Sequence, residues 1–210
     1  ITEPSVSELL QDNGERVSFI RDIDDGINNA NLVFVSVGTP TSEIGETDLT
    51  ALNNVMKELS MFCTSDLPIL IRSTIPIGLS RKYSDLYPNL SIHFHPEFLR
   101  EGTAVKDFFS PPKIVLGAKV ADDCRSYAIL ESLYSEFDCP KFVVSFESAE
   151  SVKYADNIFH ALKVVFTNEI SKVVASKNAD PREVMEIFRS DRQLNVSPAY
   201  LKPGFAYGGS

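Results

Sequence analysis

Short apolar runs alternate with longer mixed segments over the first two thirds of the chain. The runs occupy residues 32–37, 68–73, 90–94, 113–117 and 142–146. Because apolar residues follow one another in these runs, they predict strands buried on both faces, as in a parallel sheet covered by helices. Apolar residues at helical spacing fill the intervening segments 47–62 and 121–137. The alternation predicts an α/β fold with a mostly parallel sheet.

The pattern changes near residue 148. Residues 148–176 contain neither glycine nor proline and keep an apolar stripe, which predicts one long helix. A helix of this length is typical of a domain connector or of a surface that packs against another subunit. Asp180 followed by Pro181 indicates the start of a second helix. We therefore expect one domain over residues 1–147 and a helical domain over residues 148–210.

Composition narrows the possible partners. The 210 residues are 43% hydrophobic and 23% charged, as in ordinary globular proteins. The net charge of −9 disfavours a nucleic-acid partner, because such binding needs clustered lysine and arginine. No apolar run approaches the roughly 18 residues of a membrane span, so we expect no membrane partner. Cys63, Cys124 and Cys139 lack metal-ligand spacing, which predicts no metal site, reduced thiols and a cytoplasmic protein.

Small hydroxyl and acidic residues follow the predicted strands. Thr39 comes after the first run, Thr74 after the second and Glu97 after the third. The carboxyl ends of parallel strands meet at one edge of a sheet, where ligands bind in open α/β folds. These residues therefore predict a site at this edge of the sheet, in which Glu97 is a general base or holds a water molecule. In a simpler interpretation the threonines only end strands, and Glu97 caps a helix that begins at Pro96.

The long predicted helix carries a second group of polar residues. Lys153, Asn157 and His160 are spaced by four and three residues, which places them on one side of a helix, and Asn168 lies near that side. This face could bind an oxygen-rich ligand, or it could be an ordinary solvated face. His93 and His95 flank Phe94, so at least one of them is expected to face the interior.

Several motifs, in order along nearly the whole chain, resemble those of the UDP-glucose/GDP-mannose 6-dehydrogenase family. They include Val37-Gly38-Thr39-Pro40, Arg72-Ser73-Thr74-Ile75-Pro76, Pro96 to Ala104, Lys153 to Asn157 and Gly208-Gly209-Ser210. The stretch from Leu194 to Phe205 is more similar to the GDP-mannose branch than to the UDP-glucose branch. Lys202 and Ala199 depart from that branch, which tends to have arginine and often tyrosine at these positions. An arginine at position 202 could donate two parallel hydrogen bonds to a phosphate, whereas Lys202 offers only a compact point charge.

The resemblance implies a Rossmann-like, doubly wound NAD domain, incomplete here, followed by the start of a helical dimerisation domain. It implies NAD-dependent oxidation of a sugar C6 alcohol to a carboxylate in two steps, with GDP-mannose favoured over UDP-glucose, and a homodimer formed through residues 148–176. The implied catalytic residues are Thr74, Glu97, Lys153 and Asn157. The implied NAD-binding residues are Val37, Gly38, Thr39, Pro40, Ser73, Thr74 and Glu101. The implied substrate-binding residues are Phe98, Leu99, Arg100, Glu101, His160, Asn168, Tyr200, Lys202 and Phe205.

The resemblance also predicts that the chain is an interior piece of a larger enzyme. In the family, the nucleophilic cysteine directly follows the Gly-Gly-Ser that here stands at 208–210, and the glycine-rich pyrophosphate turn belongs to a first βαβ unit that would precede Ile1. We assign no nucleophile to the cysteines present and expect the 210 residues alone to be inactive. Two alternatives stay open at this point: another oxidoreductase of the β-hydroxyacid dehydrogenase type, and a non-catalytic dimerisation module.

Overall fold

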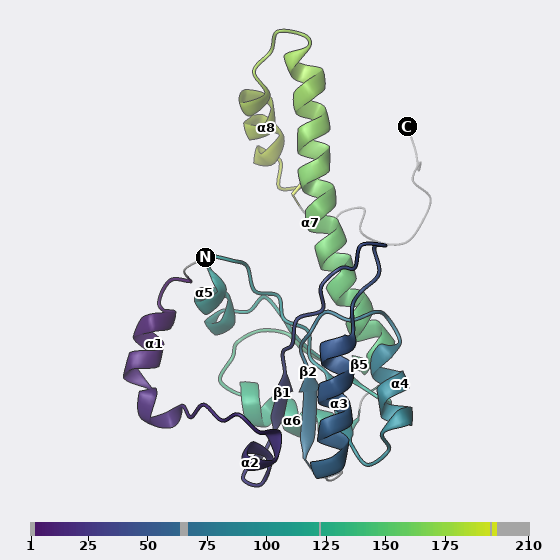
Figure 1. The fold of residues 1–210 in the computed structure, drawn as a ribbon. Coiled ribbons are helices and arrows are strands. Elements are labelled where there is room, and N and C mark those ends of the chain that lie inside the picture. The colour runs from purple at the N-terminus through teal and green to yellow at the C-terminus, as the bar shows by residue number, and fades with distance from the viewer. Residues whose placement is uncertain (1–2, 64–66, 122, 194, 197–210) are drawn as a thin grey trace. The chain divides into compact units, whose positions relative to one another are not determined.

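The structure is a computed structural model that describes residues 3–63, 67–121, 123–193 and 195–196 (Figure 1). The strands are β1 (Val33–Val35), β2 (Pro68–Ile71), β3 (Ser91–Phe94), β4 (Ile114–Ala118) and β5 (Lys141–Ser145). The helices are α1 (Val6–Asp12), α2 (Ile23–Ile27), α3 (Thr50–Phe62), α4 (Leu79–Leu86), α5 (Ala104–Phe109), α6 (Cys124–Tyr134), α7 (Phe146–Ala175) and α8 (Pro181–Ser190), with a short 3₁₀ turn at Gly14–Arg16. The residues up to Ala155 form one compact unit, and those from Asp156 onward form a second.

The described strands of the first unit form one sheet in the order β1-β2-β3-β4-β5. β1, β2 and β3 pair in parallel, and so do β4 and β5. β3 and β4 pair antiparallel through Phe94 and Gly117. The sheet is therefore mostly parallel, which confirms the predicted α/β class.

Alternation along the strands builds a core on each face of the sheet. In β2, Ile69 and Ile71 pack into the core that includes α3 and α4, whereas Leu70 between them packs into the core that includes α6. Burial on both faces explains why the strands appear in the sequence as continuous apolar runs. In Figure 1, α3 runs alongside β2.

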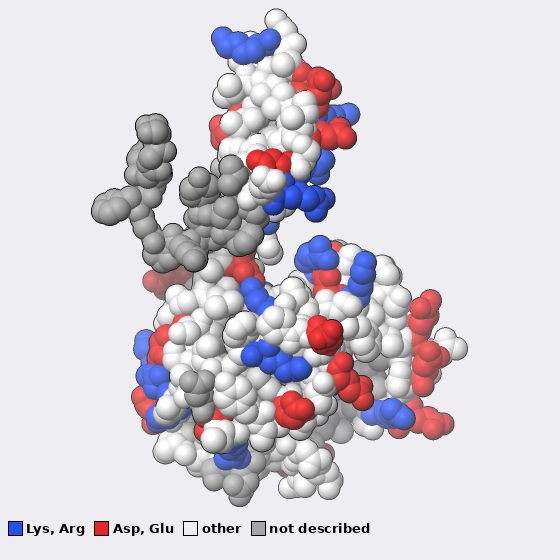
Figure 2. Space-filling view, turned by 180° about the vertical axis from the view of Figure 1, so that it is seen from behind, with Lys and Arg blue, Asp and Glu red and all other residues white. Residues whose placement is uncertain are grey.

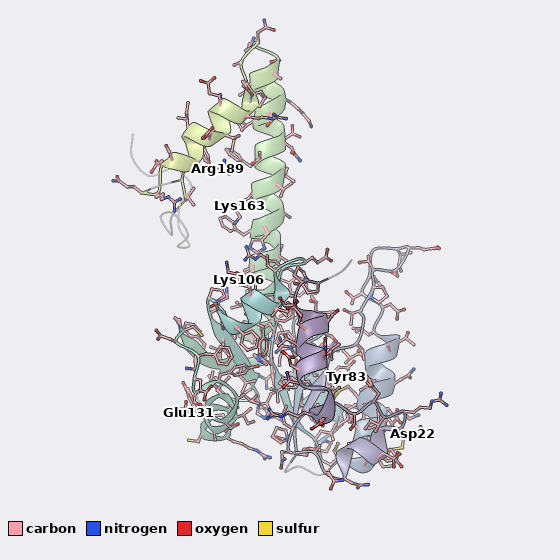
Figure 3. All side chains as sticks on the ribbon, turned by 90° about the vertical axis from the view of Figure 1, so that its left-hand side faces the viewer. Asp22, Tyr83, Lys106, Glu131, Lys163 and Arg189 are labelled. Carbon is pink, nitrogen blue, oxygen red and sulfur yellow. The ribbon has the colours of Figure 1, made fainter. Side chains whose placement is uncertain are left out.

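A hydrogen bond joins two helices of the same layer. The hydroxyl of Tyr83 in α4, labelled in Figure 3, donates to Oδ1 of Asn53 in α3 over 2.6 Å. Burial raises the pKa of Tyr83 to about 12, so the hydroxyl keeps its proton at neutral pH. On the surface, basic and acidic side chains are interspersed over the visible face of the first unit (Figure 2).

The helix predicted to begin at Pro96 is absent: residues 95–100 have no regular secondary structure, and α5 begins only at Ala104. In a helix the carbonyl of Glu97 would accept a hydrogen bond from an N–H four residues later. Here that carbonyl accepts from Nζ of Lys153 instead. Gly102 then takes φ of 80°, a left-handed conformation that suits glycine and not a helix interior.

The two helices predicted near the end of the chain are present as α7 and α8. Only the first two turns of α7 have buried residues, at Phe146, Ala149, Glu150 and Lys153. In α8, Asp180 accepts a hydrogen bond from the N–H of Arg182, and Pro181 is the first helical residue. Within the second unit, the rings of Phe166 and Phe188 lie 5.4 Å apart and pack α8 against α7.

Candidate active site

The loops that follow β1 and β2 are tied together by two hydroxyl groups. Oγ of Ser73 accepts a hydrogen bond from the N–H of Val37 over 2.9 Å and donates to its carbonyl over 2.7 Å. Oγ1 of Thr39 donates to the carbonyl of Thr74 over 2.7 Å. These residues lie side by side because β1 and β2 are parallel neighbours. A Cβ built on Gly38 would meet no atom within 4 Å, so the backbone at this edge is open to a ligand.

The predicted catalytic pair of Glu97 and Lys153 is in direct contact. Nζ of Lys153 donates to Oε1 of Glu97 over 2.8 Å and to its backbone carbonyl over 2.6 Å. The side chain of Lys153 is only 8% exposed, and that of Glu97 is 31% exposed. An ammonium has three N–H donors, and these two bonds use two of them. The arrangement therefore leaves one donor for an oxygen atom of a ligand.

The loop after Glu97 is held by its own side chains. Oε2 of Glu97 accepts a hydrogen bond from the N–H of Leu99 over 2.7 Å. The centre of the Phe98 ring lies 5.8 Å from Nζ of Lys153 and 4.6 Å from Nζ of Lys113. Such contacts between a cation and an aromatic face are attractive. The loop thus presents a carboxylate and an aromatic ring at the buried lysine.

Arg100, a predicted substrate-binding residue, is paired with an acid of α5. Its guanidinium donates to both carboxylate oxygens of Asp107, over 2.7 and 3.0 Å, and its backbone N–H donates to Oδ2 over 3.0 Å. These hydrogen bonds hold the pKa of Asp107 well below its usual range. The side chain of Arg100 is nevertheless 70% exposed. Glu101 and Leu99 are also exposed in this loop.

A cleft beside Glu97 brings in residues that the sequence did not single out. Arg72, Lys113 and Tyr134 line it together with Glu97 and Phe98. Arg72 directly follows β2, Lys113 directly precedes β4, and Tyr134 is the last residue of α6. Arg72 belongs to the motif Arg72 to Pro76, so its place near the site could have been predicted, although no role was assigned to it. Nothing in the sequence near Tyr134 marks that residue, because it reaches the cleft through the packing of α6.

His95 stands at the start of the same loop and is buried. Its Nδ1 donates to the carbonyl of Val115 over 2.8 Å, so Nε2 accepts from the hydroxyl of Tyr134 over 2.7 Å. Burial, with a smaller effect from the charge of Arg72, lowers the pKa of His95 to about 4. The imidazole is therefore neutral at physiological pH and serves as an anchor for the loop.

The remaining predicted residues divide into two groups. Asn157, His160 and Asn168 are exposed residues of α7 in the second unit. α7 is continuous, so Lys153, Asn157 and His160 follow one another along one side of it. Tyr200, Lys202 and Phe205 lie outside the described residues.

Within the described ranges, no group of three or more His, Cys, Asp and Glu residues could hold a metal ion. None of the helices in that part of the chain combines the length and apolar character of a membrane span. Cys63 is buried, and burial raises the pKa of its thiol, which makes it a poor nucleophile.

Known proteins resemble this chain over its whole length. It is 34% identical to GDP-mannose 6-dehydrogenase of Pseudomonas aeruginosa and 32% identical to UDP-glucose 6-dehydrogenase YwqF of Bacillus subtilis, and each alignment covers 100% of the chain but only 51% and 49% of the relative. The chain thus spans about half the length of the curated relatives it matches.

Solved structures give the same result. A ternary complex of GDP-mannose dehydrogenase from P. aeruginosa superposes with a TM-score of 0.90 at 34% identity, covering 100% of this chain and 51% of that one. A UDP-glucose dehydrogenase from Pyrobaculum islandicum superposes with a TM-score of 0.82 at 30% identity, covering 93% of this chain and 47% of that one.

Family models divide the chain in two. Residues 1–138 match the NAD binding domain of the UDP-glucose/GDP-mannose dehydrogenase family, and residues 147–210 match its central domain. NAD is the cofactor that the first match indicates. With the strand-edge loops, the Glu97–Lys153 pair and these matches in agreement, the chain belongs to the UDP-glucose/GDP-mannose dehydrogenase family.

Proposed function

We propose that this chain forms the middle of an NAD-dependent nucleotide-sugar 6-dehydrogenase, which oxidises the C6 alcohol of the sugar to a carboxylate. In this proposal residues 1–147 are part of the NAD-binding domain, and residues 148–210 begin a helical dimerisation domain. The observation that carries it is the contact between Nζ of Lys153 and Glu97, at 2.8 Å from Oε1, beside the carboxyl edge of the sheet.

The strand-edge loops fit a bound dinucleotide. Gly38 leaves open space in front of the backbone, and Ser73 and Thr39 hold the loops after β1 and β2 in one arrangement. In the proposal the NAD-binding residues predicted from the sequence line this edge, and NAD, when bound, supplies the hydride acceptor. A rigid, small-residue edge lets a cofactor approach the backbone closely.

The reacting oxygen would lie against Lys153. As the C6 hydroxyl loses its proton, negative charge develops on oxygen, and the unused N–H of the Lys153 ammonium stabilises that charge. Glu97 accepts the proton directly or through a water held with Thr74, because its carboxylate oxygens have lone pairs beyond the two hydrogen bonds described. Asn157, one helical turn after Lys153, would add a second donor.

The loop after Glu97 and the exposed face of α7 would hold the nucleotide sugar. We assign the hexose and its phosphates to Phe98, Leu99, Glu101 and His160, with Arg100 beside them, and the nucleotide to Asn168, Tyr200, Lys202 and Phe205. GDP-mannose is the favoured substrate and UDP-glucose the second, which follows the order of identity among the relatives quoted above. The cytoplasm stays the predicted location.

Replacing Lys153 by Ala in an enzyme that contains these residues tests the proposal. Loss of a preorganised donor to a developing oxyanion lowers kcat by about 10²–10³-fold or more. NADH formation would be followed with GDP-mannose and with UDP-glucose, and circular dichroism would confirm folding. Unchanged turnover in a folded Lys153→Ala variant would contradict the proposal.

The same assay on the 210 residues alone tests the expectation that they do not complete the site. We expect no steady NADH production. Oxidation of the alcohol to the aldehyde needs no thiol, but in the family the second oxidation passes through a nucleophilic cysteine, and we assign that role to none of Cys63, Cys124 and Cys139. Steady turnover by the isolated 210 residues would refute this part of the proposal.

A further inference from the structure

Glu150 is a fully buried carboxylate in the second turn of α7. Its side chain reaches the amino end of α4, where Oε2 accepts a hydrogen bond from the N–H of Gly78 over 2.5 Å and Oε1 accepts from the N–H of Ser80 over 2.9 Å. These N–H groups belong to the first turn of a helix and would otherwise lack partners. The partial positive charge of the helix end favours the carboxylate there.

A buried carboxylate is costly unless its hydrogen bonds compensate, and here the two backbone N–H groups at the start of α4 supply them. What the carboxylate adds is a fixed position. Two backbone donors seventy residues away in the sequence must meet both of its oxygens. A slide of α7 along the sheet, or a rotation about its own axis, breaks both bonds at once.

Lys153 lies three residues further along the same buried stripe of α7. One turn of helix separates the two side chains, so they move together. Glu150 is bonded to α4 on one side, and Lys153 is bonded to the loop after β3 on the other. Gly117 of β4 allows the helix to come close enough, since a Cβ there would lie 2.8 Å from the Cβ of Ala149.

We propose that Glu150 is a positioning residue, which holds the ammonium of Lys153 at Glu97 by fixing the first two turns of α7 to the amino end of α4. The inference rests on the function proposed above for Lys153. Glu150 itself touches neither substrate nor cofactor in this proposal. It acts through the helix that both residues share.

The reactivity of Lys153 toward an amine-reactive reagent tests the proposal without any assay of activity. In the 210-residue chain, trinitrobenzenesulfonate labels a buried lysine only when the segment opens, and mass spectrometry measures the rate at Lys153. In Glu150→Gln, one oxygen becomes an NH₂ group that cannot accept a hydrogen bond. We expect labelling of Lys153 to accelerate about tenfold or more, the factor that loss of one charge-assisted hydrogen bond produces.

Glu147→Gln is the matched control, because Glu147 also joins α7 to α4 through its ion pair with Arg81. That pair is 37% and 39% exposed, so solvent screens it more than the fully buried bonds of Glu150. Labelling of Lys153 should therefore accelerate clearly less in Glu147→Gln than in Glu150→Gln. Unchanged labelling in a folded Glu150→Gln variant, or an equal acceleration in Glu147→Gln, would overturn the proposal.

Hydrogen–deuterium exchange on the wild-type chain keeps the test valid if Glu150→Gln fails to fold. We expect the amide hydrogens of Gly78 and Ser80 to exchange at the rate of the α7 segment around Lys153, because the same opening exposes them. Fast exchange at both amides while that segment stays protected would refute the link.

In the active enzyme, Glu150→Gln should lower kcat and leave KM for NAD unchanged. If Lys153→Ala leaves turnover intact, the proposed function fails, whereas the labelling rate still decides the role of Glu150.

Discussion

His93 and His95 alternate with Phe94 at the end of β3, and both are buried on the side of the sheet that α6 covers. His95 bonds Val115 and Tyr134, and Nδ1 of His93 lies 3.2 Å from the hydroxyl of Ser126. Burial is the main cause that lowers the pKa of each imidazole to about 4. Both are therefore neutral in the folded protein under conditions in which an exposed histidine would be charged.

This depressed pKa makes stability depend on pH. Between pH 4 and about 6.5, the ordinary histidine pKa, the unfolded chain binds more protons than the folded one, so the free energy of unfolding falls as pH falls through this window. Each pKa unit corresponds to about 1.4 kcal/mol, so a single histidine contributes up to about 3 kcal/mol of this loss. Urea unfolding of the wild type at pH 7 and at pH 4.5 should show it.

The variant His95→Gln measures the part of this pH dependence that comes from His95. Glutamine does not titrate, so the difference in the free energy of unfolding between pH 7 and pH 4.5 should become smaller, although stability at pH 7 also decreases. His93→Gln, at the other buried imidazole, should make that difference smaller in the same way, because burial also lowers the pKa of His93 to about 4. An identical pH dependence in wild type and His95→Gln would disprove this assignment.

At the residue scale, the sequence singled out Glu97 and Lys153 as candidate site residues but not the anchors behind them. Glu97 is recognisable because it follows a strand, and Lys153 because of its spacing with Asn157. Glu150 has no such local signal: an acidic residue in a helix is ordinarily a solvated one. Its partner in α4 is seventy residues away in the sequence, and only the packed structure brings them together.

Elements were predicted best where one pattern persists over many residues. α7 was expected over 148–176 and occupies Phe146–Ala175, because thirty residues without glycine or proline leave no other regular structure. The reversal between β3 and β4 was not predicted, because any strand covered by helices on both faces gives a continuous apolar run, whether its neighbour is parallel or antiparallel. The helix expected from Pro96 does not form, because the backbone carbonyl of Glu97 accepts a hydrogen bond from Nζ of Lys153 and not from a later N–H of a helix.

Contact between α7 and the sheet depends on Gly117 of β4. An added Cβ there would lie 2.8 Å from the Cβ of Ala149 and 3.3 Å from the Cα of Phe146. Gly117→Ala therefore pushes the helix away from the strand, and such overpacking costs about 1–3 kcal/mol. Thermal unfolding should show a lower Tm, and labelling of Lys153 should accelerate.

Gly14→Ala is the control for this prediction, because a Cβ at Gly14 would meet no atom within 4 Å. The double variant Gly117→Ala, Ala149→Gly removes the closest clash and should recover part of the lost stability, less the cost of about 1 kcal/mol for glycine within a helix. Equal Tm values for Gly117→Ala and wild type would show that the packing adapts without loss.

For the whole molecule, the expected homodimer depends on the part of α7 in the second unit. Ile158, Leu162 and Val165 are 63%, 58% and 54% exposed, and their spacing places them on one side of the helix. α8 covers a different part of this helix through Phe166 and Phe188. Exposed apolar stripes of this kind are typical of helical interfaces between subunits.

A charge within that stripe should separate the subunits. Leu162→Glu would bury an unpaired carboxylate at the interface, which costs more than the interface gains from a single leucine, so we expect a monomer by analytical ultracentrifugation at concentrations where the wild type is a dimer. Lys177→Gln changes the net charge by the same amount after the end of α7 and should leave the dimer intact. A wild-type chain that sediments as a monomer at all concentrations would refute the expected dimer, and a dimeric Leu162→Glu would place the interface on another face. At about 100° per residue, Asn157 and His160 lie on a different side of α7 from this stripe, so a partner helix packed on Ile158, Leu162 and Val165 would leave both residues accessible.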